Sequence, residues 1–451
     1  MEGLPAPRRY LAMVALWLGT SLTVLDGNIV GVALPTLARD LRVHPSEAVL
    51  VVTVYQLVLV MTVLPFSAVG ERIGLRRLYQ YGQWVFLLAS ATCVFVSSLP
   101  WLLCTRVLQA LGAAAALSVA TALIRETYPS RQLGRGLALN NVIVSSATAL
   151  APVIGGAILG LFSWRYLFVL TPPLALLSIM IGRHSLPDPI HRPKPYDVLG
   201  AVLCAGTIGI TVAGIETAVH GGHVAWSMPA ILAGAIIGTV FVRRELRSDA
   251  PILPVDLLAN PVIGLSFLAA HLTFIGSATL MLSLPFRLQA EYGFTPSEVG
   301  AAISPWPLTM IVVAPLAAEL SDRYRAPVLG SIGMVLATLG VLSLAMLPRS
   351  IEHWQLVWRM MLIGLGYGMF FSPNIRTIVK LTPPNRVASA GGLISTNRLI
   401  GQTLGATLLA MLLSLGVGAT KTTAWVVAAL TLTSLACNLL RLRYPMPSST
   451  G

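Results

Sequence analysis

Charged residues are scarce in this chain. Asp, Glu, Lys and Arg make up 10% of its 451 residues, against about 25% in an ordinary globular domain. The chain is 55% hydrophobic, with a mean hydropathy of +0.79. So few charges cannot cover a water-exposed surface, which excludes a soluble enzyme. The composition predicts a protein that crosses a membrane many times.

Cysteine is also rare, and its placement excludes a disulfide framework. The four cysteines all lie in apolar segments without a CxxC pair: Cys93, Cys104, Cys204 and Cys437. We interpret them as small packing residues. His220-Gly-Gly-His223 contains two histidines, but no acid or cysteine cluster completes a zinc site. We expect a periplasmic turn there, and neither a metal nor a cofactor.

Motifs of nucleotide-driven or hydrolytic enzymes are absent. The sequence has no P-loop, no GxSxG and no HExxH. Without a nucleotide-binding domain, a self-contained ATP-driven pump is excluded, and nothing indicates an enzyme. Any transport must draw on an ion gradient or on the gradient of the substrate.

Fourteen apolar segments run through the chain. Each is longer than the ~9–11 residues of a barrel strand, so helices are expected and the fold class is an all-α polytopic membrane protein. The first segment is too long for a cleavable signal and has no small-residue cleavage site after it, so we expect a retained helix. The predicted segments are 10–36, 46–69, 78–98, 101–124, 137–161, 166–183, 198–218, 228–243, 260–286, 297–320, 326–347, 353–373, 387–415 and 423–441.

The distribution of basic residues predicts the topology. Of the 30 Lys and Arg, 21 fall in loops on the side of the N-terminus, 6 on the opposite side and 3 inside segments. By the positive-inside rule, both termini are cytoplasmic, and we expect the cytoplasmic membrane of a bacterium. Topology therefore accounts for the net charge of +13, and nucleic-acid binding is not required.

Weak internal repetition predicts two halves. The loop 67–77 and the segment 318–323 both place small residues, an acid and an arginine at the cytoplasmic end of a helix. Such repeats are typical of secondary transporters. We predict a six-helix bundle over 1–196, two inserted linker helices over 197–250 and a second six-helix bundle over 251–451. The Pro-rich stretch 186–195 is the expected joint after the first bundle.

Asp26 is the most informative residue, because it lies deep inside the first apolar segment. A carboxylate at such depth costs at least ~2.5–3.5 kcal/mol and usually marks an ion or proton pathway. Binding a proton removes that cost. The sequence predicts that Asp26 is a proton carrier; the alternative is a packing residue bonded to a neighbour such as Asn28.

Other polar residues fall inside predicted helices. Arg106 either snorkels to the outer interface or takes part in proton coupling, and Gln109 lies one turn further on. His271, Asn397 and Arg398 lie deep in their segments, whereas Glu216 is near an outer end. Each can face a substrate cavity or serve only in packing. The candidate cavity residues are Asn28, Gln109, Glu216, His271, Asn397 and Arg398.

Five sequence patterns together resemble the major facilitator superfamily, specifically its fourteen-helix drug:proton antiporter branch. The resemblance covers nearly the whole chain. It includes Asp26 with the run Ile29-Val-Gly-Val-Ala-Leu-Pro35, the loop with Glu71, Arg72, Gly74 and Arg76, the fourth-helix residues Arg106, Gln109 and Gly112, the fifth-helix residues Ala147, Ala151, Pro152, Gly155 and Gly156, and Trp164-Arg165 with Phe168 and Pro172. Small residues replace several of the usual glycines.

The resemblance implies a mechanism of alternating access between two six-helix bundles. It implies proton coupling through Asp26 and Arg106, and a flexible or sealing role for the fifth-helix residues. It implies a conformational latch at the loop with Glu71, Arg72, Gly74 and Arg76, which Asp322 and Arg323 repeat in the second half.

The expected function is proton-coupled export of amphipathic small molecules, without a cofactor. Interior acids are absent from the late segments and Arg398 is present, so neutral, monocationic or anionic substrates are expected rather than dications. The alternatives are a dedicated exporter of one metabolite or antibiotic, and a non-transporting membrane scaffold or receptor. The oligomeric state is open, and a monomer is compatible with the sequence.

Overall fold

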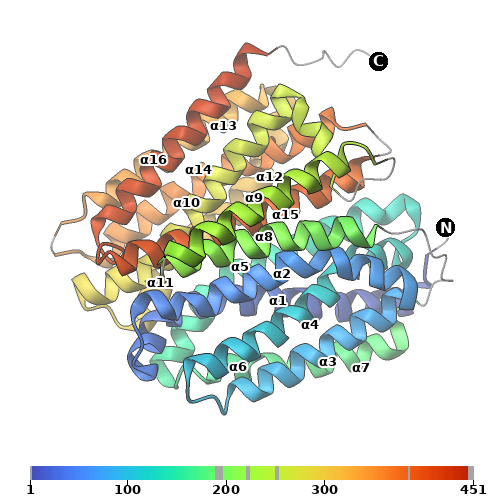
Figure 1. The fold of residues 1–451 in the computed structure, drawn as a ribbon, viewed down its shortest axis with the longest axis horizontal. Coiled ribbons are helices and arrows are strands. Elements are labelled where there is room, and N and C mark those ends of the chain that lie inside the picture. The colour runs from blue at the N-terminus through green and yellow to red at the C-terminus, as the bar shows by residue number, and fades with distance from the viewer. Residues whose placement is uncertain are drawn as a thin grey trace. The chain divides into compact units, whose positions relative to one another are not determined.

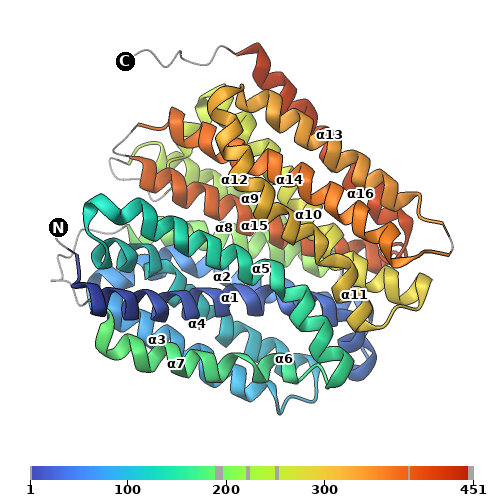
Figure 2. The same cartoon turned by 180° about the vertical axis from the view of Figure 1, so that it is seen from behind.

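The fold is known from a computed structural model, which describes residues 3–187, 197–219, 224–248, 253–348, 350–383 and 386–444. In these ranges all regular elements are helices, which confirms the all-α prediction. The chain forms two compact units (Figures 1 and 2). The predicted turn at His220 and His223 and most of the predicted joint at 186–195 lie outside the described residues.

Unit 1 comprises residues 1–241 and 294–301. Its helices are α1 (Ala6–Leu41), α2 (Pro45–Ile73), α3 (Leu75–Cys93), α4 (Leu99–Thr127), η1 (Ser130–Gln132), α5 (Leu133–Leu161), α6 (Tyr166–Val169), α7 (Thr171–Ser185), α8 (Val198–Val219), α9 (Val224–Glu245) up to residue 241, and α11 (Pro296–Ile303) up to residue 301.

Unit 2 comprises residues 242–293 and 302–451. Its helices are η2 (Val255–Ala259), α10 (Pro261–Tyr292), α12 (Pro305–Arg323), α13 (Ala326–Ala345), α14 (His353–Leu381), α15 (Val387–Ser414), α16 (Lys421–Leu440) and η4 (Arg441–Arg443).

Local sequence signals set several helix ends. A capping box joins His44 and Glu47 at the start of α2, and the Asn260 side chain accepts from two backbone N–H groups at the start of α10. Proline divides two of the predicted segments: α7 begins at Thr171 just before Pro172, and α12 begins at Pro305. Proline removes a backbone donor and crowds the preceding turn, which explains both breaks.

Each of the fourteen predicted segments lies on one helix or on one of these two broken pairs. Among the described residues, eleven helices or pairs are long and apolar enough to span a membrane. The helices α3, α14 and α15 are not in that set. The number of fourteen crossings and the cytoplasmic placement of both termini therefore stay predictions.

Unit 1 is built around α1, which packs against α2, α4, α5 and α7. The helices α3 and α7 run side by side in both views (Figures 1 and 2). A buried set of hydrogen bonds joins three of these helices. The hydroxyls of Tyr79 and Ser178 both donate to the Ala15 carbonyl at 2.8 Å, so α3 and α7 are held to the same turn of α1.

Unit 2 repeats this packing. The Ser434 hydroxyl of α16 donates to the Ala269 carbonyl of α10 at 2.8 Å, as Ser178 does to Ala15. Glycines also allow the same close approach: Gly82 meets Gly112 between α3 and α4, and Gly333 meets Gly366 between α13 and α14.

The repeat gives a residue correspondence between the units. Ala15 and Ala269 are 254 positions apart, as are Gly112 and Gly366. The same offset therefore relates α1 to α10 and α4 to α14. The boundaries of the two compact units do not coincide with the predicted boundaries at 196 and 250, and α8 packs on α2 of unit 1. The three-part division remains a prediction.

Candidate functional site

A buried ion pair lies in the interior of unit 1. The Arg106 Nη1 atom of α4 is 2.5 Å from the Asp26 Oδ2 atom of α1, and both side chains are 0% exposed. Asp26 is 20 residues from the start of α1 and 15 from its end, so it lies roughly 22 Å or more from either end of the helix. Arg106 does not snorkel. It is turned inward to the carboxylate, so the structure brings together the two residues predicted for proton coupling.

The other contacts of Arg106 hold it in place. Its Nε donates to the Val51 carbonyl at 3.2 Å, and its guanidinium carbon lies 4.2 Å from the ring centre of Tyr55. The Tyr55 hydroxyl donates to the Thr23 carbonyl at 2.9 Å, which fixes the ring beside α1. The aromatic face attracts the cation, so α2 contributes to the charge balance of the pair. Sequence reasoning did not single out Tyr55.

Gln109 completes the cluster from one turn further along α4. Its Oε1 accepts from Arg106 at 3.0 Å, and its Nε2 donates to the Ser90 hydroxyl at 2.9 Å and more weakly to Asp26 at 3.5 Å. Gln109 is 0% exposed. It therefore belongs to the ion-pair cluster in this conformation. The prediction that it lines a substrate cavity remains a prediction.

Asn28 is not a partner of Asp26. Its side-chain amide donates to the Val24 carbonyl of its own helix at 2.6 Å, and the residue is half-buried. Its place in a substrate cavity stays a prediction. Glu216 is half-buried near the end of α8, as its sequence position suggests.

A second polar cluster lies in unit 2. His271 Nδ1 of α10 and Asn397 Oδ1 of α15 are 2.7 Å apart, and the Asn397 amide also donates to the Phe267 carbonyl at 3.1 Å. Arg398, the next residue, is exposed to solvent. Three of the predicted cavity residues therefore lie together, 10 residues from the start of α10 and 10–11 from the start of α15.

An aromatic group at the same depth was missed by sequence reasoning. Phe274 of α10 stacks on Phe371 of α14, with ring centres 4.6 Å apart and planes 20° apart. Tyr367 and Trp306 lie behind them, with Tyr367 centred 6.1 Å from Phe371 and 5.6 Å from Trp306. Aromatic residues in an apolar helix carry no distinct signal, and only the spacing of Tyr367 and Phe371 by one turn could have drawn attention.

The latch residues of unit 1 lie at the junction of α2 and α3. Gly74 has φ +107°, a backbone angle that other residues rarely adopt, and it separates the two helices. Arg76 donates to the Arg183 carbonyl at the end of α7, whereas Glu71 and Arg72 are exposed. The structure explains Gly74 and Arg76 as elements of a tight turn. The latch function stays a prediction.

In unit 2 the corresponding segment ends α12. Arg323 is exposed, and the side chain of Asp322 is outside the described residues. Arg376 of α14 donates to the Ala318 carbonyl and to the Ser321 hydroxyl, so an arginine again ties a neighbouring helix to this segment.

The fifth-helix residues lie at two close helix contacts within unit 1. Ala151 and Pro152 are buried in α5. A Cβ atom at Gly155 would be 3.1 Å from the Ile29 carbonyl oxygen of α1, and one at Gly156 would be 2.9 Å from the Pro296 carbonyl oxygen of α11. Both positions therefore favour glycine for close packing.

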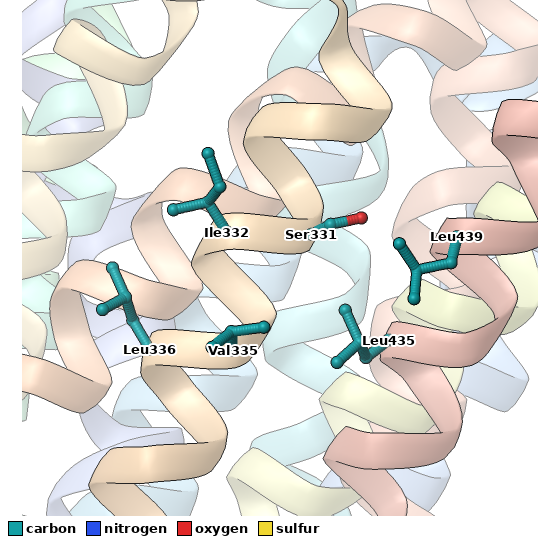
Figure 3. Close-up of a pocket in the computed structure, with 6 residues that line it drawn as sticks. All are labelled: Ser331, Ile332, Val335, Leu336, Leu435 and Leu439. Carbon is teal, nitrogen blue, oxygen red and sulfur yellow. The ribbon is translucent and has the colours of Figure 1, made fainter.

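A groove on unit 2 has different chemistry. It has a volume of about 270 Å³ and lies between α13 and α16, which run side by side (Figure 3). Its lining is Ser331, Ile332, Val335, Leu336, Leu435 and Leu439. The only hydroxyl in this lining, that of Ser331, already contacts Pro327 and Asn438. An apolar lining of this kind fits a surface against lipid and offers nothing to orient a charged substrate.

These features define a class of protein. Two helical units with the same internal packing, many apolar helices long enough to span a bilayer, and ionisable residues deep inside them are characteristic of a multi-pass membrane transporter.

The comparison with protein families agrees with that class. The model described as Major Facilitator Superfamily matches residues 16–242 and 266–451, so the chain belongs to this superfamily. A solved structure with the same fold is that of a bacterial homolog of the human lysosomal transporter Spinster. It has a TM-score of 0.73 at 16% identity and covers 98% of both chains.

Sequence relatives include transporters with several descriptions. The chain is 40% identical to the Uncharacterized transporter YebQ of Escherichia coli, over 92% of this chain and 91% of the relative. It is 26% identical to the Riboflavin transporter RibZ of Clostridioides difficile, over 88% and 87%. It is 27% identical to the Multidrug efflux pump LfrA of Mycolicibacterium smegmatis, over 90% and 82%. The relatives thus include multidrug efflux pumps, in agreement with the drug:proton antiporter resemblance.

Proposed function

We propose that this protein exports amphipathic small molecules across the bacterial cytoplasmic membrane in exchange for protons. Asp26 is the proton-binding group and Arg106 is its partner. The observation that carries the proposal is the 2.5 Å contact between these two fully buried side chains. The relative of this chain that is described as a multidrug efflux pump supports the choice of amphipathic small molecules as substrates.

The chemistry of the pair provides a way to couple protonation to conformation. With Asp26 ionised, the pair is neutral and tolerates burial. A proton on Asp26 leaves Arg106 without a counter-charge, and a buried unpaired charge is strongly unfavourable. The protonated state therefore favours opening of the cluster to water, whereas deprotonation favours closure. This dependence is what alternating access needs from a proton site.

The proton gradient supplies enough free energy. One proton carried inward gains ~2.3 kcal/mol per 100 mV of membrane potential and ~1.4 kcal/mol per pH unit. With both contributions, one proton per cycle sustains an outward substrate gradient of roughly a hundredfold or more, since each 1.4 kcal/mol is a factor of ten.

The test measures substrate-driven proton release in proteoliposomes with an imposed pH gradient. Ethidium and other amphipathic compounds of different charge serve as substrates. Asp26→Asn is compared with Asp40→Asn, an exposed carboxylate on the same helix. We expect Asp26→Asn to abolish coupled transport and Asp40→Asn to retain it. Intact coupling in Asp26→Asn overturns the assignment of the proton site.

A dedicated exporter of one metabolite is the second candidate. It is favoured by the relative described as a riboflavin transporter, whose match covers 88% of this chain at 26% identity, against 90% at 27% for the multidrug efflux pump. The same assay separates the candidates, because a dedicated exporter couples proton movement to one compound of the panel at most.

A further inference from the structure

Arg398 is an uncompensated cation deep in unit 2. It lies 11 residues into α15, roughly 16 Å from the start of the helix. Despite this depth along the helix, the Arg398 side chain is exposed. Within the described part of the chain it makes neither an ion pair nor a hydrogen bond. A guanidinium has five N–H donors, all of which are available here.

The position of Arg398 is fixed by its neighbours. Asn397 faces α10, where it contacts His271 and the Phe267 carbonyl. One turn further on, a Cβ atom at Gly401 would be 2.6 Å from the Phe274 Cβ, so α15 and α10 are in close contact. The register of α15 against α10 is therefore set on both sides of Arg398, which fixes the backbone position from which its guanidinium extends.

The stacked pair of phenylalanines lies at the same level. Phe274 is 13 residues from the start of α10, and Phe371 is 10 residues before the end of α14, or roughly 20 and 15 Å. Both rings are half-buried, so part of each remains accessible. Trp306 and Tyr367 are buried behind them and support the stack. A flat apolar surface of this kind accepts another planar ring.

The charge of this region has one sign. The sequence contains no Asp or Glu between Asp256 and Glu291, and none after Glu352. Consequently α10, α14 and α15 carry no interior carboxylate that could attract a cationic substrate or neutralise Arg398. An anionic substrate supplies the missing counter-charge, and a cationic one meets repulsion.

We propose that unit 2 binds planar aromatic monoanions. Arg398 binds the carboxylate or sulfonate of the substrate, and Phe274 and Phe371 stack against its ring. The inference rests on the proposed export function and narrows its substrate class. His271 and Asn397 are positioning residues, because they hold α15 in register and are already bonded to each other.

Direct binding tests the proposal without any proton measurement. The probes are 2-naphthoate and 2-naphthylmethylammonium, which share a fused ring system and differ in charge. Isothermal titration calorimetry on the full-length protein in amphipol gives both dissociation constants. We expect wild type to bind naphthoate at least tenfold more tightly than the ammonium probe.

Variants locate the charge. Arg398→Gln should weaken naphthoate binding at least tenfold, and Arg398→Lys should weaken it less, since it keeps the charge but loses the planar fork. Arg443→Gln removes an exposed arginine of the same unit and serves as the control with unchanged affinity. Phe274→Leu should weaken both probes several-fold, because stacking does not depend on charge sign.

Two outcomes overturn the proposal. One is tighter binding of the ammonium probe to wild type, a result that needs no variant to fold. The other is equal naphthoate affinity in wild type, Arg398→Gln and Arg443→Gln. Failure of Asp26→Asn to abolish coupling contradicts the proton site alone and leaves this binding result unaffected, so the two hypotheses fail separately.

Discussion

The repeat between the units provides a designed test of the buried ion pair. With the offset of 254 residues, Asp26 corresponds to Leu280 and Arg106 to Met360, both of them buried in unit 2. Asp26→Leu and Arg106→Met therefore give unit 1 the side chains that unit 2 already packs at equivalent positions. The two single variants and the double variant form a thermodynamic cycle.

The expected magnitudes follow from the burial of both groups. Each single variant leaves one buried charge without its partner, which typically costs about 3–5 kcal/mol. Replacing a buried pair by apolar residues of similar volume is often neutral or stabilising by about 1–4 kcal/mol. The double variant should therefore be close to wild type or more stable, and far more stable than either single variant.

The two single variants should differ in their response to pH. After Arg106→Met, the Asp26 carboxyl can bind a proton and lose its charge. After Asp26→Leu, the Arg106 guanidinium cannot release one. The stability deficit of Arg106→Met should therefore shrink between pH 8 and pH 5, whereas that of Asp26→Leu should stay constant.

Thermal unfolding in detergent measures these differences. For a unit of the size of unit 1, a loss of 1 kcal/mol lowers the unfolding temperature by roughly 2–4 °C. Each single variant should therefore unfold roughly 6–20 °C below wild type at pH 8. A double variant that loses the sum of both single deficits would refute the reasoning, because it would show that the two charges do not stabilise each other. A well-folded double variant should also show no proton-coupled transport.

Two further predictions concern other parts of the chain. The side-chain hydrogen bonds from Arg386 lower the pKa of Asp256, so this exposed pair stabilises the protein at neutral pH and is lost as the pH falls below about 3.9, the usual aspartate value. Asp256→Asn should therefore lower stability by no more than ~1 kcal/mol at pH 7. The difference in stability between wild type and this variant should shrink as the pH falls toward 3, and a difference that grows in acid contradicts the prediction. Gly156→Val should impair transport, because its side chain would clash with the Pro296 carbonyl. Gly134→Val should not, because Gly134 lies on the same helix with open space around it. Equal activity of the two variants in a transport assay contradicts the close-contact role of Gly156.

The fold and the buried carboxylate of Asp26 could be predicted from the sequence because both have strong physical signatures. Apolar runs of membrane length identify the helices, and Asp26 is an expensive charge in such a run. The partnership with Arg106 followed only from resemblance, since 80 residues separate the two in sequence. Its alternative, a snorkelling arginine, was equally consistent with residue depth.

The rest of the site depends on contacts that no local pattern carries. Tyr55 and the Phe274–Phe371 stack are aromatic residues in apolar helices, where composition does not separate packing from function. His271 and Asn397 were candidates as separate residues, but their mutual bond joins α10 to α15 across 126 positions. The breaks at Pro172 and Pro305 were likewise hidden inside continuous apolar runs.

The repeat also shows how the two units differ in charge. Unit 1 has the Asp26–Arg106 pair where unit 2 has Leu280 and Met360, and unit 2 has His271 where the same offset gives Trp17. The helix α5 carries no charged residue beyond Arg135, so Arg398 has no counterpart in its interior. The buried ion pair and Arg398 thus lie in different units of one repeated scaffold.

This division has an electrical consequence if both proposals hold. Export of a monoanion against one entering proton moves two positive charges inward per cycle, which gains ~4.6 kcal/mol per 100 mV. Export of a monocation against one proton moves none. Naphthoate export should therefore accelerate when valinomycin and a potassium gradient make the vesicle interior, equivalent to the cytoplasm, negative, after subtraction of the rate in protein-free vesicles. A naphthoate export rate that does not depend on the potential would contradict the exchange of one monoanion for one proton.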